Sequence, residues 1–265
     1  MTTAAVAPVA LFERRSPGIV AVTLNRPEAR NALNSALVER LQDLFSALAV
    51  DHELRAVILS GAGGAAFSAG ADLRERQKLP PEQRAQHTES VNQLIEAVAA
   101  FPVPVIAAIN GYALAGGLEL ALACDLRVAA NNAVFGLPEV KIGIFPGAGG
   151  LVRLPRLVGP SVAKDLIFTG RHVPAEEAFD FGMIDRIVEP NETMEAAILL
   201  AEMIAQNAPL AVRAAKQALW ESEGLPERSA QRVVQRRRSS LDTTRDYTEG
   251  LSAFAERRVP RFTGK

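Results

Sequence analysis

Two glutamates, Glu119 and Glu139, are the residues of this chain best suited to proton chemistry. Glu119 stands in an apolar run between Leu118 and Leu120, and Glu139 follows Pro138 in a glycine-flanked loop. Glutamate is rarely buried without a partner. An apolar setting disfavours the charged carboxylate, so it raises the pKa toward the range useful for proton transfer. We therefore expect a pair of carboxyl groups that exchange protons with a ligand.

Glycine-rich segments accompany both glutamates. Gly116 and Gly117 open a predicted helix over residues 117–123, and residues 145–150 (FPGAGG) follow Glu139. Backbone amides at a helix N-terminus stabilise anions, and a glycine lets a ligand approach those amides closely. Two carboxylates beside an anion pocket are suited to proton transfer next to an enolate.

The elements that must position these residues alternate along the chain. Asn34 or Ser35 caps a helix whose apolar side chains through Leu48 share one face. Alternating strands and helices predict an α/β domain, which we place at residues 1–200, followed by a helical segment at 201–265. The predicted strands cover residues 19–24, 55–60, 105–109 and 126–129, and the further helices cover 91–99, 149–156, 161–169, 175–181, 194–206 and the chain from 209 onward.

Composition excludes several classes of protein. The net charge of −1 indicates no general attraction to nucleic acid or to a membrane surface. Cys124 is the only cysteine, so no disulfide can form within the chain. This fits a reducing compartment, and we expect a cytoplasmic protein in which Cys124 is a small buried hydrophobe. Residues 1–10 lack the pattern of a signal peptide, and no apolar run reaches the ~18 residues of a membrane span.

Other motifs favour structural interpretations. The Gly61-x-Gly63 pattern after a strand does not open directly into a helix, so a flexible surface loop is favoured over a dinucleotide site. Ser68 belongs to no nucleophile motif. The three histidines are expected to be solvated or capping, and no metal-ligand spacing appears. We therefore predict no metal and no separate cofactor. The turn at residues 69–72 and the Gly116-Gly117 turn could each serve only close packing.

Taken together, the motifs carry a resemblance along nearly the whole chain. The sequence resembles the enoyl-CoA hydratase/isomerase (crotonase) superfamily in residues 25–27 (NRP), 31–33 (NAL), 67–73 (FSAGADL), 104–111 (PVIAAING), 115–119 (AGGLE), 138–139 (PE) and 146–150 (PGAGG). Within the superfamily, residues 70–76 (GADLRER) and 260–265 (PRFTGK) are similar to the AU-rich-RNA-binding methylglutaconyl-CoA hydratase branch.

The resemblance implies a fold and an assembly. It implies a crotonase-like spiral of ββα units followed by a C-terminal helical trimerisation segment. Such chains assemble as homotrimers or as homohexamers, a dimer of trimers.

The resemblance also implies roles for particular residues. The backbone N–H groups of Ala71 and Gly116 would form an oxyanion hole for the thioester oxygen. Glu119 would activate and orient a water, and Glu139 would deliver a proton to the α-carbon. Coenzyme A would belong to the substrate. Five positions would contact its nucleotide end: Ala69, Asp72 and Leu73 through their backbone in the same subunit, and Phe254 and Arg257 from a neighbouring one.

From residues and resemblance together we expect an enoyl-CoA hydratase that converts a 2-trans-enoyl-CoA to a 3-hydroxyacyl-CoA, in fatty-acid or branched-chain amino-acid degradation. The alternatives are a methylglutaconyl-CoA hydratase, a 3,2-enoyl-CoA isomerase, an RNA-binding homologue and a catalytically idle oligomeric scaffold. RNA binding is disfavoured because Arg74 and Lys78 share a helical face on which the next position is Glu82, after Pro80-Pro81. The sequence does not fix the acyl chain length.

Overall fold

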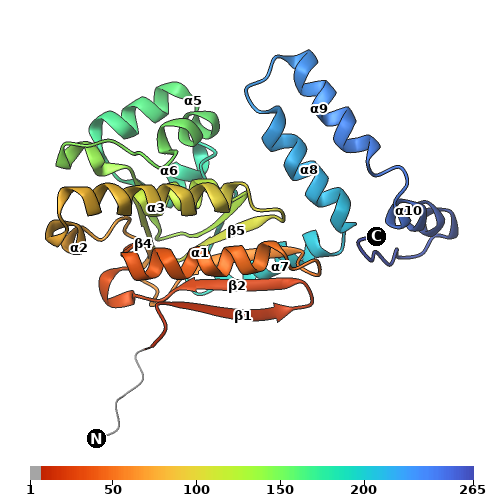
Figure 1. The fold of residues 1–265 in the computed structure, drawn as a ribbon, viewed down its shortest axis with the longest axis horizontal. Helices are drawn as coiled ribbons and strands as arrows, with labels where there is room; N and C mark the ends of the chain where they lie inside the picture. The colour runs from red at the N-terminus through yellow and green to blue at the C-terminus, as the bar shows by residue number, and fades with distance from the viewer. Residues whose placement is uncertain (1–6) are drawn as a thin grey trace, which may run out of the picture.

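The structure of this chain is a computed structural model that describes residues 7–265. The prediction that residues 1–10 form no signal peptide falls mostly on residues 1–6, which lie outside the described part. The described chain forms two β-sheets wrapped by helices, followed by three helices that project from this body (Figure 1).

The larger sheet carries the main core. Its β5 strand is buried along its whole length, as expected where both faces of a parallel sheet are covered. Only β1, which pairs with β2, is antiparallel. The six strands, in sheet order, are β1 (Ala10–Ser16), β2 (Ile19–Leu24), β3 (Ala56–Gly61), β5 (Val105–Ile109), β7 (Leu126–Ala130) and β10 (Arg186–Val188).

The smaller sheet is made of very short strands. In it β4, β6 and β8 run parallel to one another, and β9 is antiparallel to β8. Its strands, in sheet order, are β4 (Ala66–Ser68), β6 (Tyr112–Leu114), β8 (Val134–Gly136) and β9 (Val173–Pro174).

The chain alternates between the two sheets, one ββα unit at a time. Each unit contributes a strand to the larger sheet, then a strand to the smaller sheet, then a helix. The three units are β3–β4–α2 (Leu73–Lys78), β5–β6–α4 (Gly116–Ala123) and β7–β8–η2 (Pro138–Ile142). The predicted α/β class and the spiral of ββα units are confirmed.

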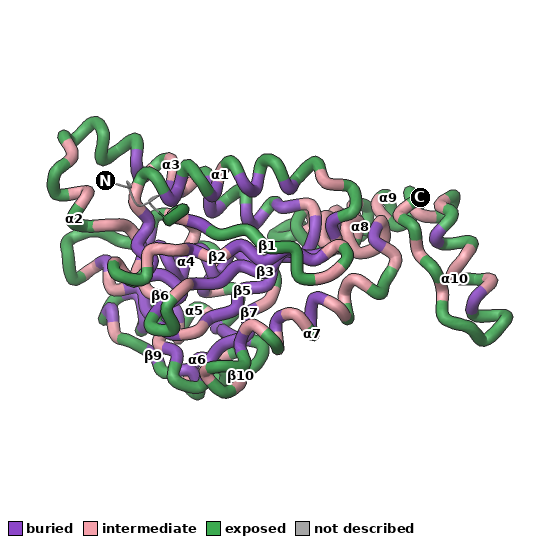
Figure 2. Tube along the Cα trace, turned by 90° about the horizontal axis from the view of Figure 1, so that it is seen from below, coloured by how far each residue is buried: buried purple, intermediate pink, exposed green. Residues whose placement is uncertain are grey.

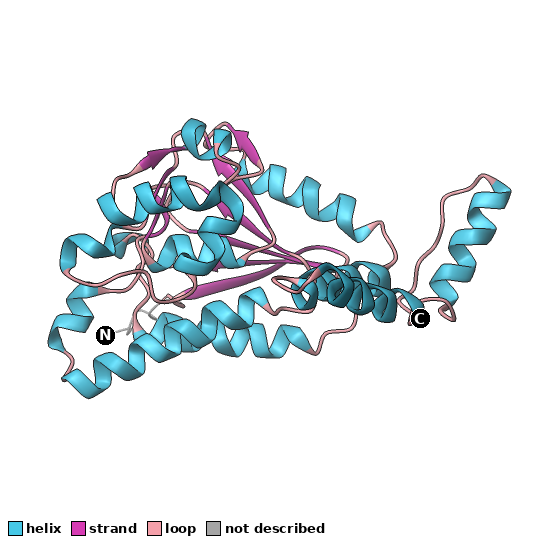
Figure 3. Ribbon diagram, turned by 90° about the horizontal axis from the view of Figure 1, so that it is seen from above, coloured by secondary structure: helices cyan, strands magenta, loops and turns pink. Residues whose placement is uncertain are grey.

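Helices cover both faces of the larger sheet (Figure 3). One face packs against α7 (Thr193–Ala205). The other face shares its core with α1 (Ser35–Ala49), α3 (Pro81–Ala99) and α4. The buried residues of Figure 2 therefore concentrate in the strands and in the helix faces turned toward them. The remaining elements of the body are η1 (Pro27–Ala29), α5 (Gly150–Thr169) and α6 (Ala175–Asp180).

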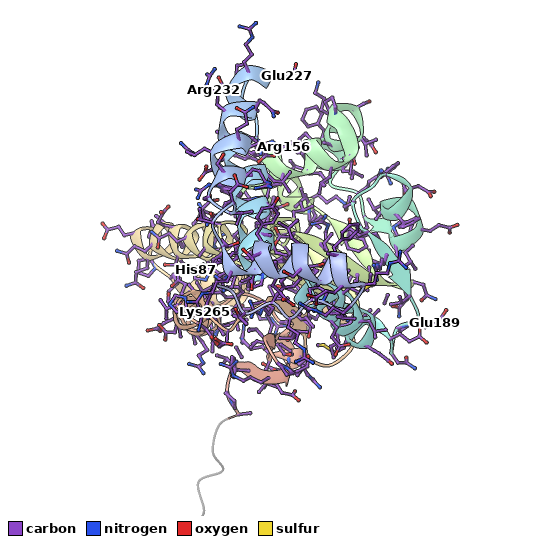
Figure 4. The ribbon with its side chains drawn as sticks, turned by 90° about the vertical axis from the view of Figure 1, so that its right-hand side faces the viewer. His87, Arg156, Glu189, Glu227, Arg232 and Lys265 are labelled. Carbon is purple, nitrogen blue, oxygen red and sulfur yellow. The ribbon has the colours of Figure 1, made fainter. Side chains whose placement is uncertain are left out.

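The C-terminal segment forms a helical projection. The helices α8 (Pro209–Ser222) and α9 (Glu227–Ser239) form a hairpin, and α10 (Arg245–Glu256) follows it. Glu227 and Arg232 lie toward the outer end of the hairpin (Figure 4). The boundary placed at residue 200 from the sequence falls inside α7, and residues 257–265 form no helix.

Helices were easier to anticipate than strands. Asn34 caps α1 by accepting a hydrogen bond from the Leu37 N–H, and the predicted apolar face of α1 is buried. The two helices predicted at 149–156 and 161–169 are the halves of α5, which kinks at Gly159 before Pro160.

Among the described residues no single helix is long and apolar enough to span a membrane. The helices α7 and α8 meet that length and composition only as a pair bent by 106°.

Candidate active site

Three turns of the smaller sheet bring the candidate residues together. Because β4, β6 and β8 are parallel neighbours, their carboxyl ends lie at one edge of the sheet. Ala71 follows β4, Gly116 follows β6 and Glu139 follows β8. Ligands of α/β proteins commonly bind outside the carboxyl ends of strands. The fold therefore gathers three predicted site residues that are far apart in the sequence.

Glu119 is a buried carboxylate held by backbone amides. It lies on α4 with 4% of its surface exposed. Its Oε1 accepts hydrogen bonds from the N–H groups of Ala148 (2.7 Å) and Gly150 (2.8 Å). Burial raises the pKa of Glu119, while the two amides and the charge of Arg153 act to lower it. One oxygen is thus fixed, and Oε2 accepts no hydrogen bond from residues 7–265.

Glu139 is equally buried but is not held in this way. It lies in η2 with 7% of its surface exposed, and its buried Oε2 has no hydrogen-bond partner in the described chain. Burial, with a smaller contribution from the charge of Glu119, raises the pKa of Glu139 to about 7. The Glu139 carboxyl is therefore poised to take up or release a proton near neutral pH.

The backbone N–H groups of Ala71 and Gly116 lie next to each other. A Cβ built on Gly70 would be 2.9 Å from the Gly116 nitrogen, and one built on Gly116 would be 3.8 Å from the Ala71 nitrogen. Neither N–H donates to an acceptor within residues 7–265. Two unpaired amides side by side suit an oxyanion.

The two glycines that open α4 have different roles. A Cβ on Gly117 would lie 2.2 Å from the Ser68 carbonyl oxygen, so Gly117 is required for packing. A Cβ on Gly116 would meet nothing closer than 3.7 Å. The lack of a side chain at Gly116 therefore leaves open space beside the paired amides. Packing explains one of these glycines and access to the amides explains the other.

Backbone strain sits at the same turn. Ala115, the N-cap of α4, has φ 51° and ψ −131°, a conformation that residues with a Cβ seldom adopt. Its N–H donates to the Gly136 carbonyl at 2.9 Å, which ties the turn after β6 to the end of β8. The strained residue immediately precedes the Gly116 amide and helps to aim it.

The turn that carries Ala71 is fixed by buried polar contacts. Ser68 Oγ donates to the Asn31 carbonyl at 2.9 Å and accepts from the Gly70 N–H at 3.2 Å. Asp72 accepts from Arg26 Nη1 at 3.0 Å and caps α2. These bonds, together with those of Asn31 to Ala62 and Ala66, hold the Ala71 amide in place.

The predicted coenzyme A positions fall into two places. Ala69, Asp72 and Leu73 adjoin Ala71, and the Asp72 side chain, which is not part of the predicted backbone contacts, pairs with Arg26. Phe254 is 86% exposed on α10, and Arg257 ends that helix. Because α10 lies at the opposite end of the molecule from α4 (Figure 2), these two residues do not reach the site of their own chain.

Several remaining expectations can be compared with the structure. Cys124 is buried, and burial raises the pKa of its thiol to about 12, so it is not a nucleophile. His52 and His172 are exposed, but the expectation of a solvated or capping residue is wrong for His87, which is 5% exposed within α3. Gly61 is the buried last residue of β3, and residues 62–65 form a surface turn that leads into β4, so the Gly61-x-Gly63 segment opens no helix. In residues 7–265, no three metal-binding side chains converge.

Sequence reasoning missed what the amides of residues 148–150 bind. The glycine-rich start of α5 does bind an anion, but that anion is the carboxylate of Glu119 itself. The sequence feature that could have indicated this contact is Gly149, which adopts φ 103° in the turn that presents these amides. The site as a whole offers one oriented carboxylate, one unpaired carboxyl and two free amides, which suits proton transfer beside a developing oxyanion.

Comparison with known proteins agrees with this arrangement. The family model described as enoyl-CoA hydratase/isomerase matches residues 14–265. The chain is 44% identical over 247 residues to the probable enoyl-CoA hydratase 2, mitochondrial, of Arabidopsis thaliana, covering 93% of this chain and 82% of that protein. It is 40% identical over 255 residues to the 2,3-dehydroadipyl-CoA hydratase of Escherichia coli, covering 96% and 99%. The crystal structure of an enoyl-CoA hydratase from Bacillus anthracis superposes with a TM-score of 0.95 at 42% identity, covering 97% and 100%.

Proposed function

The chain belongs to the enoyl-CoA hydratase/isomerase family, and from this premise we propose that it adds water to a 2-trans-enoyl-CoA to give a 3-hydroxyacyl-CoA. One observation carries the proposal. Two buried glutamates with different hydrogen-bonding environments adjoin a pair of unpaired amides. Moving a proton between two carbons needs one pivoting carboxyl group, whereas hydration also needs a group that holds and deprotonates a water.

In the proposed reaction the thioester oxygen lies between the N–H groups of Ala71 and Gly116. Negative charge develops on that oxygen as water attacks the β-carbon, and the two amides stabilise it. The unpaired oxygen of Glu119 accepts a proton from the attacking water. Glu139 gives a proton to the α-carbon. The carbon–carbon double bond becomes a single bond, the O–H bond of the water is broken, and one O–C bond and one C–H bond are formed. Proton exchange with solvent then returns Glu119 to the carboxylate and Glu139 to the protonated form before the next turnover.

The direct test is a hydration assay on crotonyl-, decenoyl- and methylglutaconyl-CoA, followed by the loss of absorbance of the conjugated thioester. We expect hydration of at least one of them, and the preferred chain would define the substrate class. If the protein instead converts 3-enoyl-CoA to 2-enoyl-CoA far faster than it hydrates any of the three, an isomerase replaces this proposal.

We also propose that the chain works as a homotrimer or as a dimer of trimers, with residues 201–265 forming the contacts. Large apolar side chains are exposed on the projecting helices, including Leu219 (75%), Leu251 (56%) and Phe254 (86%). Sedimentation should therefore give three or six times the chain mass of 28.3 kDa. A monomer at micromolar concentration would contradict this.

Coenzyme A recognition across subunits is part of the same proposal. Arg257 is exposed and ends α10, a helix that Figure 1 shows apart from the ββα body, so any contact with the nucleotide must come from a neighbour. Arginine binds phosphate through charge-assisted hydrogen bonds. We expect Arg257→Ala to raise the KM for crotonyl-CoA at low salt and to weaken its salt dependence. An unchanged KM at both salt concentrations would argue against this contact.

Three expectations from the sequence stay predictions. We predict no RNA partner, and α2 ends at Lys78 before α3 begins at Pro81, so Arg74 and Glu82 do not share one helix. Tight, steeply salt-dependent binding of AU-rich RNA in a filter assay would contradict it. A cytoplasmic location and the absence of a separate cofactor also remain predictions.

A further inference from the structure

Arg153 lies on the first turns of α5 and contacts the loop at residues 146–150, whose amides hold Glu119. Its side chain is 16% exposed. Its Nη1 donates to the Ala148 carbonyl at 3.1 Å, and its Nη2 donates to Glu96 Oε2, on α3, at 2.8 Å. The guanidinium therefore joins the α3 helix to the loop at residues 146–150.

The peptide groups that Arg153 and Glu119 bind belong to the same loop residue. Ala148 accepts from Arg153 through its carbonyl and donates to Glu119 Oε1 through its N–H. A guanidinium that fixes Ala148 thus limits how far Glu119 can shift. Fixing one oxygen of Glu119 also determines where its other oxygen points.

Gly149 makes room for this arrangement. A Cβ built at Gly149 would lie 1.9 Å from Arg153 Nη1, and the residue has φ 103°. The backbone of the loop and the guanidinium therefore fit together only because position 149 has no side chain.

The charges around this group are otherwise paired. Arg156, also on α5, pairs with Glu223 at 2.6 Å, and Lys216 of α8 pairs with Asp125 at 2.7 Å. Glu139 of η2 faces Glu119 from across the site and carries the same sign of charge when ionised. Arg153 is the cation of the described chain whose charge acts to lower the pKa of Glu119.

We propose that Arg153 is a positioning residue for Glu119, which orders the loop at residues 146–150 so that one oxygen of Glu119 is fixed and the other is presented to water. This inference rests on the proposed hydratase function. Arg153 has no direct part in the reaction and acts only through the Ala148 peptide and through its charge.

The test compares Arg153→Met, Arg153→Lys and a matched control. The control is Arg156→Met. Arg156 lies one turn further along α5 and is also paired with a carboxylate. Both arginines line a cleft of about 730 Å³ between α4, α5 and α8. Figure 4 shows Arg156 beside the projecting hairpin, where it pairs with Glu223.

We expect Arg153→Met to lower kcat for crotonyl-CoA by about 10²-fold, the cost of a small misplacement of a catalytic group, with KM changed by no more than about threefold. Arg153→Lys keeps the charge but cannot bridge both acceptors with a planar fork, so its loss should be smaller, about tenfold. Arg156→Met should stay within about twofold of wild type, since exposed ion pairs contribute little.

The pH dependence of kcat/KM distinguishes a positioning role from a merely structural one, because a purely structural role would leave it unchanged. Without the positive charge the pKa of Glu119 rises, so the acid limb of kcat/KM should move to higher pH in Arg153→Met and less so in Arg153→Lys. If Arg153→Met behaves like Arg156→Met in kcat and in its pH profile, the proposal is wrong. Loss of the fold in both Arg153 variants, read by circular dichroism, would assign Arg153 to stability and would also overturn it.

A measurement without substrate separates this inference from the proposed function. Infrared pH-difference spectra, with the Glu119 band identified by its loss in Glu119→Gln, report the pKa of Glu119 directly. If wild type hydrates no enoyl-CoA, the proposed function fails, yet a higher pKa of Glu119 in Arg153→Met would still support the role of Arg153. If wild type is active and this pKa does not change, only the inference about Arg153 fails.

Discussion

Glu119 and Glu139 are both buried glutamates beside one site, but their surroundings differ. Glu119 has one oxygen fixed by two amides and a cation nearby, whereas Glu139 has a buried oxygen without any partner in the described chain. Hydrogen bonds to a carboxylate favour its charged form, and burial without them favours the neutral form. The same residue type is therefore suited to act as an oriented base at one position and as an acid near neutrality at the other.

This contrast shows that burial alone does not assign a role to a carboxyl group. The exposed fractions of Glu119 (4%) and Glu139 (7%) are nearly the same. The difference comes from what the neighbouring backbone donates. The start of α5 donates two N–H groups to Glu119, whereas only the N–H of its own residue acts to lower the pKa of Glu139, whose buried Oε2 has no partner in the described chain.

The largest expected effect comes from removing each role separately. Glu119→Gln and Glu139→Gln keep the side-chain shape and remove the proton exchange, so each should lower kcat for crotonyl-CoA by about 10²–10⁴-fold with KM changed much less. Steady-state kinetics of both variants checks this. Hydration at a near wild-type rate by Glu119→Gln would show that Glu119 does not activate the water, and the contrast between the two acids would lose its functional meaning.

A second effect tests whether both acids act beside the same oxyanion. In Gly116→Ala the added Cβ meets no atom closer than 3.7 Å in the protein, but it occupies the space beside the Ala71 and Gly116 amides. We expect kcat to fall by about 10²–10³-fold with an unchanged melting temperature. Gly117→Ala is the matched variant, because its Cβ would lie 2.2 Å from the Ser68 carbonyl oxygen, and it should lose stability. If Gly116→Ala is fully active, the paired amides do not bind the thioester oxygen.

The contrast can be sharpened by pH. The pKa of Glu139 is raised to about 7, so the protonated form that donates to the α-carbon is lost above that pH. We expect kcat/KM to fall about tenfold for each pH unit on the basic side. Measurement of kcat/KM between pH 5 and 9 should place this limb near 7, and Glu139→Gln should lack it. A flat profile through pH 8 would contradict the role of Glu139 as the acid.

The smallest expected effect is on stability. The pKa of Glu139 is higher in the folded chain than its ordinary value of 4.5, so the folded state retains a proton that the unfolded state loses. Stability should therefore fall as pH rises from about 4.5 to about 7, and the cost persists above that range. The melting temperature of Glu139→Gln should therefore exceed that of wild type by more at pH 8 than at pH 5. The expected gain is about 2–4 °C for each kcal/mol of unfolding free energy recovered. Calorimetry at the two pH values checks this, and Glu119→Gln, which weakens two amide contacts, should gain less.

The sequence predicted the large elements and most of the chemistry, but it did not place the chemistry in space. Strands such as β5 form long apolar runs, and α1 has a clear apolar face, so both could be recognised. The strands β4, β6 and β8 have three residues each, too few for any periodic pattern. Those are the strands that bring Ala71, Gly116 and Glu139 to one edge, so their proximity could be expected only from the resemblance. Arg153 carried no signal at all, because its role depends on where the loop at residues 146–150 folds back.

The alternation of the chain between two sheets also sets the order in which the site can be completed during synthesis. Each later ββα unit pairs with the one before it, and each unit adds part of the candidate site: first the Ala71 amide, then the Gly116 amide together with Glu119, then Glu139. Glu119 receives its amide donors only when residues 148–150 have followed. A growing chain that stops before residue 148 therefore contains both unpaired amides and both glutamates, yet lacks the contacts that orient Glu119.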